Sequence, residues 1–269
     1  MASMAESQAE LADDLTRRIR ASAKYRSLDE SLVRRVSAEA ALRFSDRKAA
    51  VKYARRKLHQ AFGAFLTGSP GDAVRRCVEA IRSGTGVRDA CLSAMRAHAS
   101  TAERIAWLDP FYEQVAGWCG EPRSVVDLAC GLNPLALPWL HVAPEPRYWC
   151  CDIDRDLAAA LARLDGVFPV EVQAETCDLL AAASPPPADL ALLLKTVTTL
   201  EQQRTGAAGQ VLAALDCPHV VLSLPRRSLS ARRSYVDDPL TPALADGTYR
   251  LADQAVFGDE LVCHLVRPA

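Results

Sequence analysis

The chain has 269 residues, of which 49% are hydrophobic, and its 32 basic and 33 acidic side chains give a formal net charge of −1 at pH 7. This length and apolar content predict one large or two modest globular domains, and they exclude an intrinsically disordered or fibrous chain. No apolar run reaches the roughly 18 residues of a membrane span and the N-terminus is polar, so we expect a cytoplasmic protein with no membrane partner.

Residues 1–105 are predicted to form a helical N-terminal domain. They are rich in Ala and Arg and poor in strand formers, with breaks expected near Leu28-Asp29, near Ser45-Asp46 and over residues 67–71. Apolar residues recur at helical spacing between the first two breaks and predict a stripe that faces a core. The stripe consists of Leu32, Val33, Val36, Ala40 and Phe44.

The same region concentrates positive charge. From Arg17 to Lys57 there are 14 Lys and Arg residues against 4 Asp and Glu residues, which leaves the rest of the chain at −11. A basic module on an acidic body indicates a polyanionic partner, although a solvated helical face accounts for the charge equally well. The helix predicted after Asp46 carries the basic residues that we expect to contact phosphates of the partner. They are Lys48, Lys52, Arg55, Arg56 and Lys57.

Beyond Asp109-Pro110 the pattern changes to strands that alternate with helices. This is typical of an α/β domain with a mainly parallel sheet covered on both faces, which we assign to residues 106–269. Seven strands are expected, over residues 124–128, 148–151, 168–173, 189–194, 219–224, 247–256 and 261–266. Helices are expected over residues 135–141, 154–164 and 198–215, and the last two strands have no helix between them, as in a terminal hairpin.

The cysteines give no sign of a disulfide framework or a metal centre. There are nine, an odd number, and several lie within apolar runs that look like strands, so we expect buried, reduced thiols. No Cys-x-x-Cys pair occurs, and the sequence therefore predicts no metal site.

The turn after the first predicted strand has the pattern of a nucleoside site. Residues 129–134 are small or turn-forming, and Asp152 follows Gly131 by 21 residues at the end of the second predicted strand. In a Rossmann-like fold such a turn lets backbone N–H groups approach the ligand, while the carboxylate accepts hydrogen bonds from the ribose. Ala129 replaces the first glycine of a dinucleotide fingerprint, which favours the phosphate-free cofactor S-adenosylmethionine (SAM). Taken alone, the motif also fits another Rossmann ligand or a purely structural turn.

Further parts of a SAM pocket are expected at the ends of later strands. Asp178 and Leu179 are predicted to hold the adenine amino group and cover its ring, and Leu194 to lie beneath the methionine. Arg104 offers a bidentate cation for the SAM carboxylate. Each has a structural alternative, because an Asp after a strand also caps helices and the segment before Arg104 also fits a capping box.

Five segments of the chain carry a more specific likeness. They are residues 98–104 (HASTAER), 127–139 (DLACGLNPLALPW), 151–154 (CDID), 192–195 with 200–203 (LLLK, LEQQ) and 224–229 (LPRRSL). Together they resemble the aminoglycoside-resistance 16S ribosomal RNA methyltransferases, in the branch that modifies N7 of guanine 1405 in the decoding site. The likeness runs from about residue 24 to the C-terminus and implies a class I SAM-dependent methyltransferase, Rossmann-like with a seven-stranded sheet, behind a helical RNA-docking N-terminal domain.

The resemblance implies methyl transfer from SAM to guanine 1405 of 16S rRNA in the 30S subunit, which confers aminoglycoside resistance. It adds SAM contacts from Phe65, His98, Ala99, Ser100 and Gln203 to those given above. No catalytic acid or base is expected, because guanine N7 has a free lone pair and no proton to lose, and catalysis follows from placement. N7 lies in a deep, narrow groove of A-form RNA, so the enzyme must distort the helix or extrude the nucleotide.

One segment departs from the family pattern. Residues 225–233 (PRRSLSARR) are more basic and lack the glycines that usually follow, so they either hold the displaced RNA strand or form a solvated loop. The arginines in question are Arg226, Arg227, Arg232 and Arg233. Two other functions stay open: a small-molecule SAM methyltransferase, and a non-catalytic RNA-binding protein on a methyltransferase fold. The sequence assigns no oligomeric state.

Overall fold

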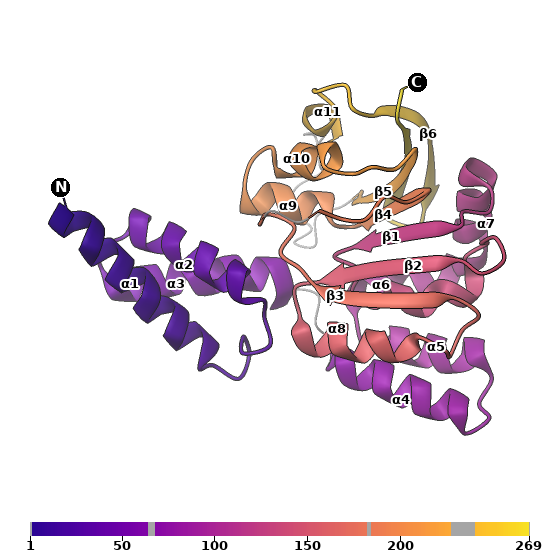
Figure 1. Ribbon diagram of the computed structural model, residues 1–269, viewed down its shortest axis with the longest axis horizontal. Coiled ribbons are helices and arrows are strands. Elements are labelled where there is room, and N and C mark those ends of the chain that lie inside the picture. Colours follow the sequence, from indigo (N-terminus) through magenta and orange to yellow (C-terminus); the bar gives the residue numbers. More distant parts are fainter. Residues whose placement is uncertain (1, 64–67, 182–183, 227–239, 269) are drawn as a thin grey trace.

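The computed structural model describes residues 2–63, 68–181, 184–226 and 240–268. Figure 1 shows a helical bundle that projects from one side of a larger body, in which helices flank a sheet. None of the helices in these ranges combines the length and hydropathy that crossing a membrane requires.

The projecting bundle, here called the N-terminal bundle, comprises α1 (Ala2–Arg20), α2 (Glu30–Arg43), α3 (Arg47–Leu58) and the π-helical turn η1 (His59–Gly63). The first two predicted breaks are confirmed as helix N-caps. The Asp29 carboxylate accepts from the backbone N–H of Ser31 at 2.8 Å, and Asp46 accepts from Ala49 at 2.8 Å. The predicted stripe is also confirmed, since its first four residues are buried in the bundle core and Phe44 packs against them.

The helices that follow belong to the larger body. They are α4 (Pro70–Arg82), α5 (Val87–Met95), α6 (Ala99–Arg104), the 3-10 turn η2 (Ile105–Trp107) and α7 (Leu108–Cys119). Buried residues of α4 and α5 share one apolar cluster with the sheet, whereas the core of the bundle ends at Phe62. The two cores therefore divide between Phe62 and Pro70 and not at residue 105, because helical periodicity does not reveal which core a helix packs against.

The sheet has seven strands, as predicted, with ends that differ from the expected ones by at most three residues. They are β1 (Ser124–Leu128), β2 (Arg147–Asp152), β3 (Glu171–Thr176), β4 (Leu190–Leu194), β5 (His219–Pro225), β6 (Arg250–Phe257) and β7 (Glu260–Val266). Their order is β3-β2-β1-β4-β5-β7-β6, with β1 to β5 parallel and the β6–β7 hairpin joined antiparallel to β5. The order reverses between β1 and β4, which opens a crevice at their carboxyl ends.

The crossover segments differ in type or extent from the predicted helices. They are η3 (Asn133–Trp139), α8 (Arg155–Leu161) with η4 (Ala162–Leu164), α9 (Val197–Gln203), α10 (Ala207–Ala213) and α11 (Leu240–Ala243). The single helix expected over residues 198–215 is wrong: Arg204 is extended, with φ −155°, and Gly206 is left-handed, with φ 77°. The helix expected over 135–141 is a 3-10 helix that contains Pro138.

Candidate active site

A cavity of about 790 Å³, counted to its open mouth, lies at the carboxyl ends of β1, β2 and β4. The predicted cofactor residues that line it are His98, Ser100, Ala129, Gly131, Asp152, Asp178, Leu179, Leu194 and Gln203. The lining residues that sequence reasoning missed include Phe62, Ile153, Leu157, Lys195, Thr196 and Leu200.

The turn between β1 and η3 brings backbone to the cavity wall. Ala129 and Gly131 both have left-handed backbone, with φ 51° and 52°. A Cβ at Gly131 would lie 3.0 Å from Cε1 of His98, so glycine alone leaves this space open without strain. The backbone N–H of Gly131 donates to Oδ2 of Asp152 at 3.0 Å, which ties the turn to the end of β2.

Asp152 presents an acceptor at the expected place. Its Oδ1 also accepts from the backbone N–H of Asp154 at 3.0 Å. Burial raises the pKa of Asp152 to about 6, against the opposing effect of the two backbone N–H donors. The carboxylate is therefore ionised at pH 7 and keeps lone pairs for the hydroxyls of a ligand.

The N-terminal bundle reaches the cavity through Arg35 of α2. Its Nε donates to Oδ2 of Asp178 at 2.8 Å, and its Nη2 donates to Oδ1 of Asp178 at 3.1 Å and to Oε1 of Gln203 at 2.8 Å. The Asp178 side chain is only 4% exposed, so the carboxylate of this bidentate pair is shielded from water. Lys57 of α3 donates to the backbone carbonyls of Gln202 and Gln203 at 2.9 and 3.1 Å. The bundle thus holds two residues that were predicted to bind the cofactor.

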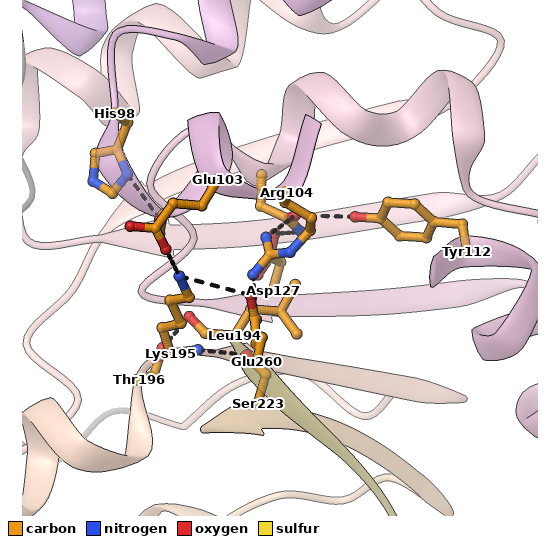
Figure 2. A network of polar contacts seen from close by, with 12 residues as sticks. His98, Glu103, Arg104, Tyr112, Asp127, Leu194, Lys195, Thr196, Ser223 and Glu260 are labelled. Atoms are coloured by element: carbon orange, nitrogen blue, oxygen red, sulfur yellow. Dashed lines mark hydrogen bonds and ion pairs between the residues drawn. The ribbon is translucent and has the colours of Figure 1, made fainter. Parts of the chain in front are cut away.

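Lys195 follows β4 with left-handed backbone, φ 58°. Figure 2 shows its ammonium between the carboxylates of Glu103 and Glu260, and it forms an ion pair with each. Its backbone N–H donates to Oγ of Ser223 at 2.9 Å, which anchors the strained turn to β5. Burial, with repulsion from Arg104 and Lys195, lowers the pKa of His98 to about 4. Among the described residues that line the cavity, Lys195 is therefore the one cation at pH 7.

Arg104 lies behind the cavity wall and is not among the lining residues. Its side chain is 1% exposed, and its Nη2 pairs with Oε1 of Glu260 at 2.7 Å while Nη1 donates to Oδ1 of Asn133 at 3.2 Å (Figure 2). The Nε atom is buried and has no hydrogen-bond partner within the described ranges. The contact of Arg104 with the SAM carboxylate stays a prediction, for which Nε is the available donor.

A buried polar network holds the long motif that begins at Asp127. The Asn133 amide and the Tyr148 hydroxyl both donate to Oδ2 of Asp127, and the Tyr112 hydroxyl donates to Oδ1 of Asn133 at 3.0 Å. Burial raises the pKa of Asp127 to about 6. These bonds fasten the start of η3 to β1 and α7, and so fix the turn that carries Gly131.

Besides Arg104, one other described residue among the predicted cofactor contacts, Ala99, does not line the cavity. Ala99 is half-buried at the start of α6, and Phe65 lies outside the described residues. Of the arginines predicted to contact RNA after β5, Arg226 is exposed, whereas Arg227, Arg232 and Arg233 lie outside the described residues.

The basic residues of α3 divide into two groups. Lys48, Lys52, Arg55 and Arg56 are exposed and available to a partner. Lys57 is half-buried and bonded to the larger body, so its predicted role as a phosphate contact gives way to a contact between the bundle and the cavity rim. Position along the helix does not distinguish the two groups, because the difference depends on what the helix packs against.

The strand order, the glycine turn and the carboxylate at the end of β2 define a class I SAM-dependent methyltransferase. The family model of the ribosomal RNA methyltransferase (FmrO) matches residues 21–262, and the chain belongs to this family.

Curated relatives and solved structures agree with this membership. The chain is 53% identical to a 16S rRNA (guanine(1405)-N(7))-methyltransferase of Micromonospora olivasterospora, over 91% of this chain and 85% of the relative. It is 32% identical to a protein of the same name from Serratia marcescens, over 93% and 96%. Among solved structures, 16S rRNA methyltransferase RmtF in complex with S-adenosyl-L-homocysteine superposes with a TM-score of 0.78 at 30% identity, covering 96% of this chain and 99% of that one.

Proposed function

We propose that this chain transfers the methyl group of SAM to N7 of guanine 1405 in 16S rRNA of the 30S subunit, in the bacterial cytoplasm, and so confers aminoglycoside resistance. The observation that carries the proposal is the match to relatives named for this reaction over 82–96% of their own lengths. The family model matches residues 21–262, which take in α2 and α3 of the N-terminal bundle and nearly all of the larger body.

The residues of the cavity fit SAM. Gly131 carries no side chain to crowd His98, so its backbone can form the cavity wall beside a ligand, and Asp152 is the acceptor for the ribose hydroxyls. Beside its bonds from Arg35 and from the backbone N–H of Leu180, Asp178 keeps acceptor capacity for the adenine amino group, and Leu179 supplies the apolar cover. Arg104 stays the predicted partner of the carboxylate of the methionine moiety, through its Nε, and Lys195, paired with Glu103 and Glu260, adds positive charge in the cavity lining. The cofactor, once bound, provides an electrophilic methyl group on its sulfonium.

Catalysis needs no proton transfer by the protein. Guanine N7 attacks through a free lone pair, so the chain has only to align the two reactants and exclude water. The lining carboxylates of Asp152 and Asp178 are already held by backbone donors and by Arg35, and a pKa lowered to about 4 makes His98 a weak base. These assignments leave none of the three as a required base.

RNA docking is assigned to the exposed basic side chains of the N-terminal bundle. Lys48, Lys52, Arg55 and Arg56 on α3 supply positive charge for phosphates of the 30S subunit, and Arg226 lies at the end of β5. Since α2 and α3 also contact Asp178 and Gln203, the bundle is held against the rim of the cavity that the target base must enter.

The proposal is tested by incubating the protein and radiolabelled SAM with 30S subunits, with deproteinised 16S rRNA and with a panel of small amines and phenols. We expect label in 30S subunits at guanine 1405, located by borohydride and aniline cleavage, which cuts at N7-methylguanine. Label on small molecules alone, or on an adenine of the decoding site, would contradict it. A protein that binds 30S subunits but transfers no label would be a non-catalytic RNA-binding protein.

A further inference from the structure

A cluster of metal-ligating side chains lies away from the cofactor cavity, at the opposite end of the sheet. It consists of Cys119, His219 and His264, whose candidate ligand atoms all lie within 4.8 Å of one another. His219 begins β5, whereas the cavity is formed at the carboxyl ends of the parallel strands. Figure 1 shows α7, which ends at Cys119, on the far side of the sheet from the N-terminal bundle.

Three elements fix the cluster. His219 and His264 lie on one face of the antiparallel β5–β7 pair, because the register places Val221 opposite His264. Their Nδ1 and Nε2 atoms are 3.0 Å apart. The end of α7 is held over them by Trp118, whose ring stacks on His264 with centroids 5.4 Å apart and whose Nε1 donates to Asp253 of β6 at 2.8 Å.

We propose that Cys119, His219 and His264 form a binding site for a zinc ion. One thiolate and two imidazoles are a ligand set that zinc prefers. In a tetrahedral zinc site, ligand atoms lie about 3.3 Å apart for two nitrogens and about 3.6 Å apart for nitrogen and sulfur. In the structure the two facing histidine nitrogens are 3.0 Å apart, and all three candidate ligand atoms lie within 4.8 Å of one another. Small side-chain rotations bring these separations to the values of a zinc site. Cys119 and His219 are half-buried, which leaves the fourth position to water.

Binding changes the protonation of the cluster in a defined way. The thiol of Cys119 gives its proton to solvent and binds as the thiolate. The hydrogen bond between the two histidines requires a proton on one of the facing nitrogens, and that proton moves to the other nitrogen of the same ring. No oxidation takes place. The ion joins the end of α7 to the antiparallel part of the sheet and has no contact with the cofactor, so its role is structural.

The site is tested on the full-length, metal-free protein with Co²⁺ as a spectroscopic probe. We expect one equivalent of Co²⁺ to produce a thiolate-to-cobalt absorption band in the near ultraviolet, which one equivalent of Zn²⁺ then removes. Cys119→Ser should lose the band, and His219→Gln should weaken Zn²⁺ binding at least tenfold. The matched control is Cys177→Ser, another half-buried cysteine, which should keep the band.

A second readout separates binding from misfolding of a variant. Zn²⁺ should raise the melting temperature of the wild-type protein and leave that of Cys119→Ser unchanged, while the two proteins melt within a few degrees of each other in chelator. Absence of the band from the wild-type protein overturns the proposal, as does a band that survives in Cys119→Ser or disappears in Cys177→Ser.

Discussion

Replacement of Asp152 by Asn tests the assignment of the cavity at a single atom. The substitution keeps the shape of the side chain, removes its charge and replaces one acceptor with a donor. Oδ2 of Asp152 accepts from Gly131 and Oδ1 accepts from Asp154, both at 3.0 Å, and the remaining lone pairs are those assigned to the ribose. Hydrogen bonds to a charged group contribute about 1.5–3 kcal/mol. We therefore expect SAM affinity to fall by roughly 10- to 150-fold.

The measurement is calorimetric titration of SAM at pH 7.5. Asp156→Asn is the matched control, because Asp156 is an exposed carboxylate near the start of α8 and is not among the cavity-lining residues. Circular dichroism melts report whether either variant is unfolded. Equal affinities for wild type and Asp152→Asn, with both folded, would refute the placement of the ribose at this carboxylate.

The dependence of SAM affinity on pH follows from the same group. The pKa of Asp152 is raised to about 6, so the carboxylate is ionised above pH 6 and gains a proton as the pH falls through that value. Wild-type affinity should therefore decline between pH 7 and pH 5, and most of this decline should be missing in Asp152→Asn. A decline of equal size in the variant would assign the effect to another group, such as Asp127, whose pKa is also raised to about 6.

Three further changes test other parts of the account. Gly131→Ala should weaken SAM binding at least tenfold, since its Cβ meets His98 at 3.0 Å. The control is Gly166→Ala, which has similar backbone strain but open space around its Cβ. That variant should cost only about 1–2 kcal/mol of stability. Arg35→Ala should lower the free energy of unfolding in urea by about 1–3 kcal/mol, because it leaves the buried Asp178 carboxylate without its ion-pair partner. Arg34→Ala removes only the exposed ion pair with Glu30 and should lower that free energy by under about 1 kcal/mol. Charge reversal of Lys52 and Arg55 should weaken 30S binding and flatten its dependence on salt without changing SAM affinity.

Each of these expectations has a contrary result. Equal SAM affinities for the two glycine variants would show that SAM binding does not depend on the missing side chain at Gly131. Equal unfolding energies for the Arg35 and Arg34 variants would show that the bond between α2 and Asp178 does not hold the bundle in solution. For the charge reversals the matched control is Arg163→Glu, which changes an exposed arginine on the larger body. A loss of 30S binding as large in that variant would mean a general effect of net charge.

Local chemistry made much of the fold and of the cavity predictable. Asp29 and Asp46 cap helices through bonds to residues two and three positions ahead, so their signals lie within one turn. Gly131 lies in the turn after β1, and Asp152 ends the adjacent parallel strand β2. The spacing of these residues and the hydrophobic pattern of the strands before them predict this arrangement.

Long-range packing decided the rest. Arg35 reaches Asp178 across 143 positions, and Arg104 reaches Glu260 across 156, so neither partner is visible in the local pattern. The break at Gly206 depends on a left-handed conformation that a glycine permits but does not require. Lys195 lay within a segment that carried the family likeness, yet its left-handed backbone and its two carboxylate neighbours appear only in the fold.

The central claim is that the cavity at the ends of β1, β2 and β4 delivers a methyl group to one base of the ribosome. The most direct measurement is mass spectrometry of 16S rRNA fragments from 30S subunits treated with SAM and either wild-type protein or Asp152→Asn. The account predicts a single added methyl group on the fragment that contains guanine 1405, produced by the wild-type protein and greatly reduced with the variant at limiting SAM. An unmodified fragment with the wild-type protein, or equal modification by both at limiting SAM, would contradict it.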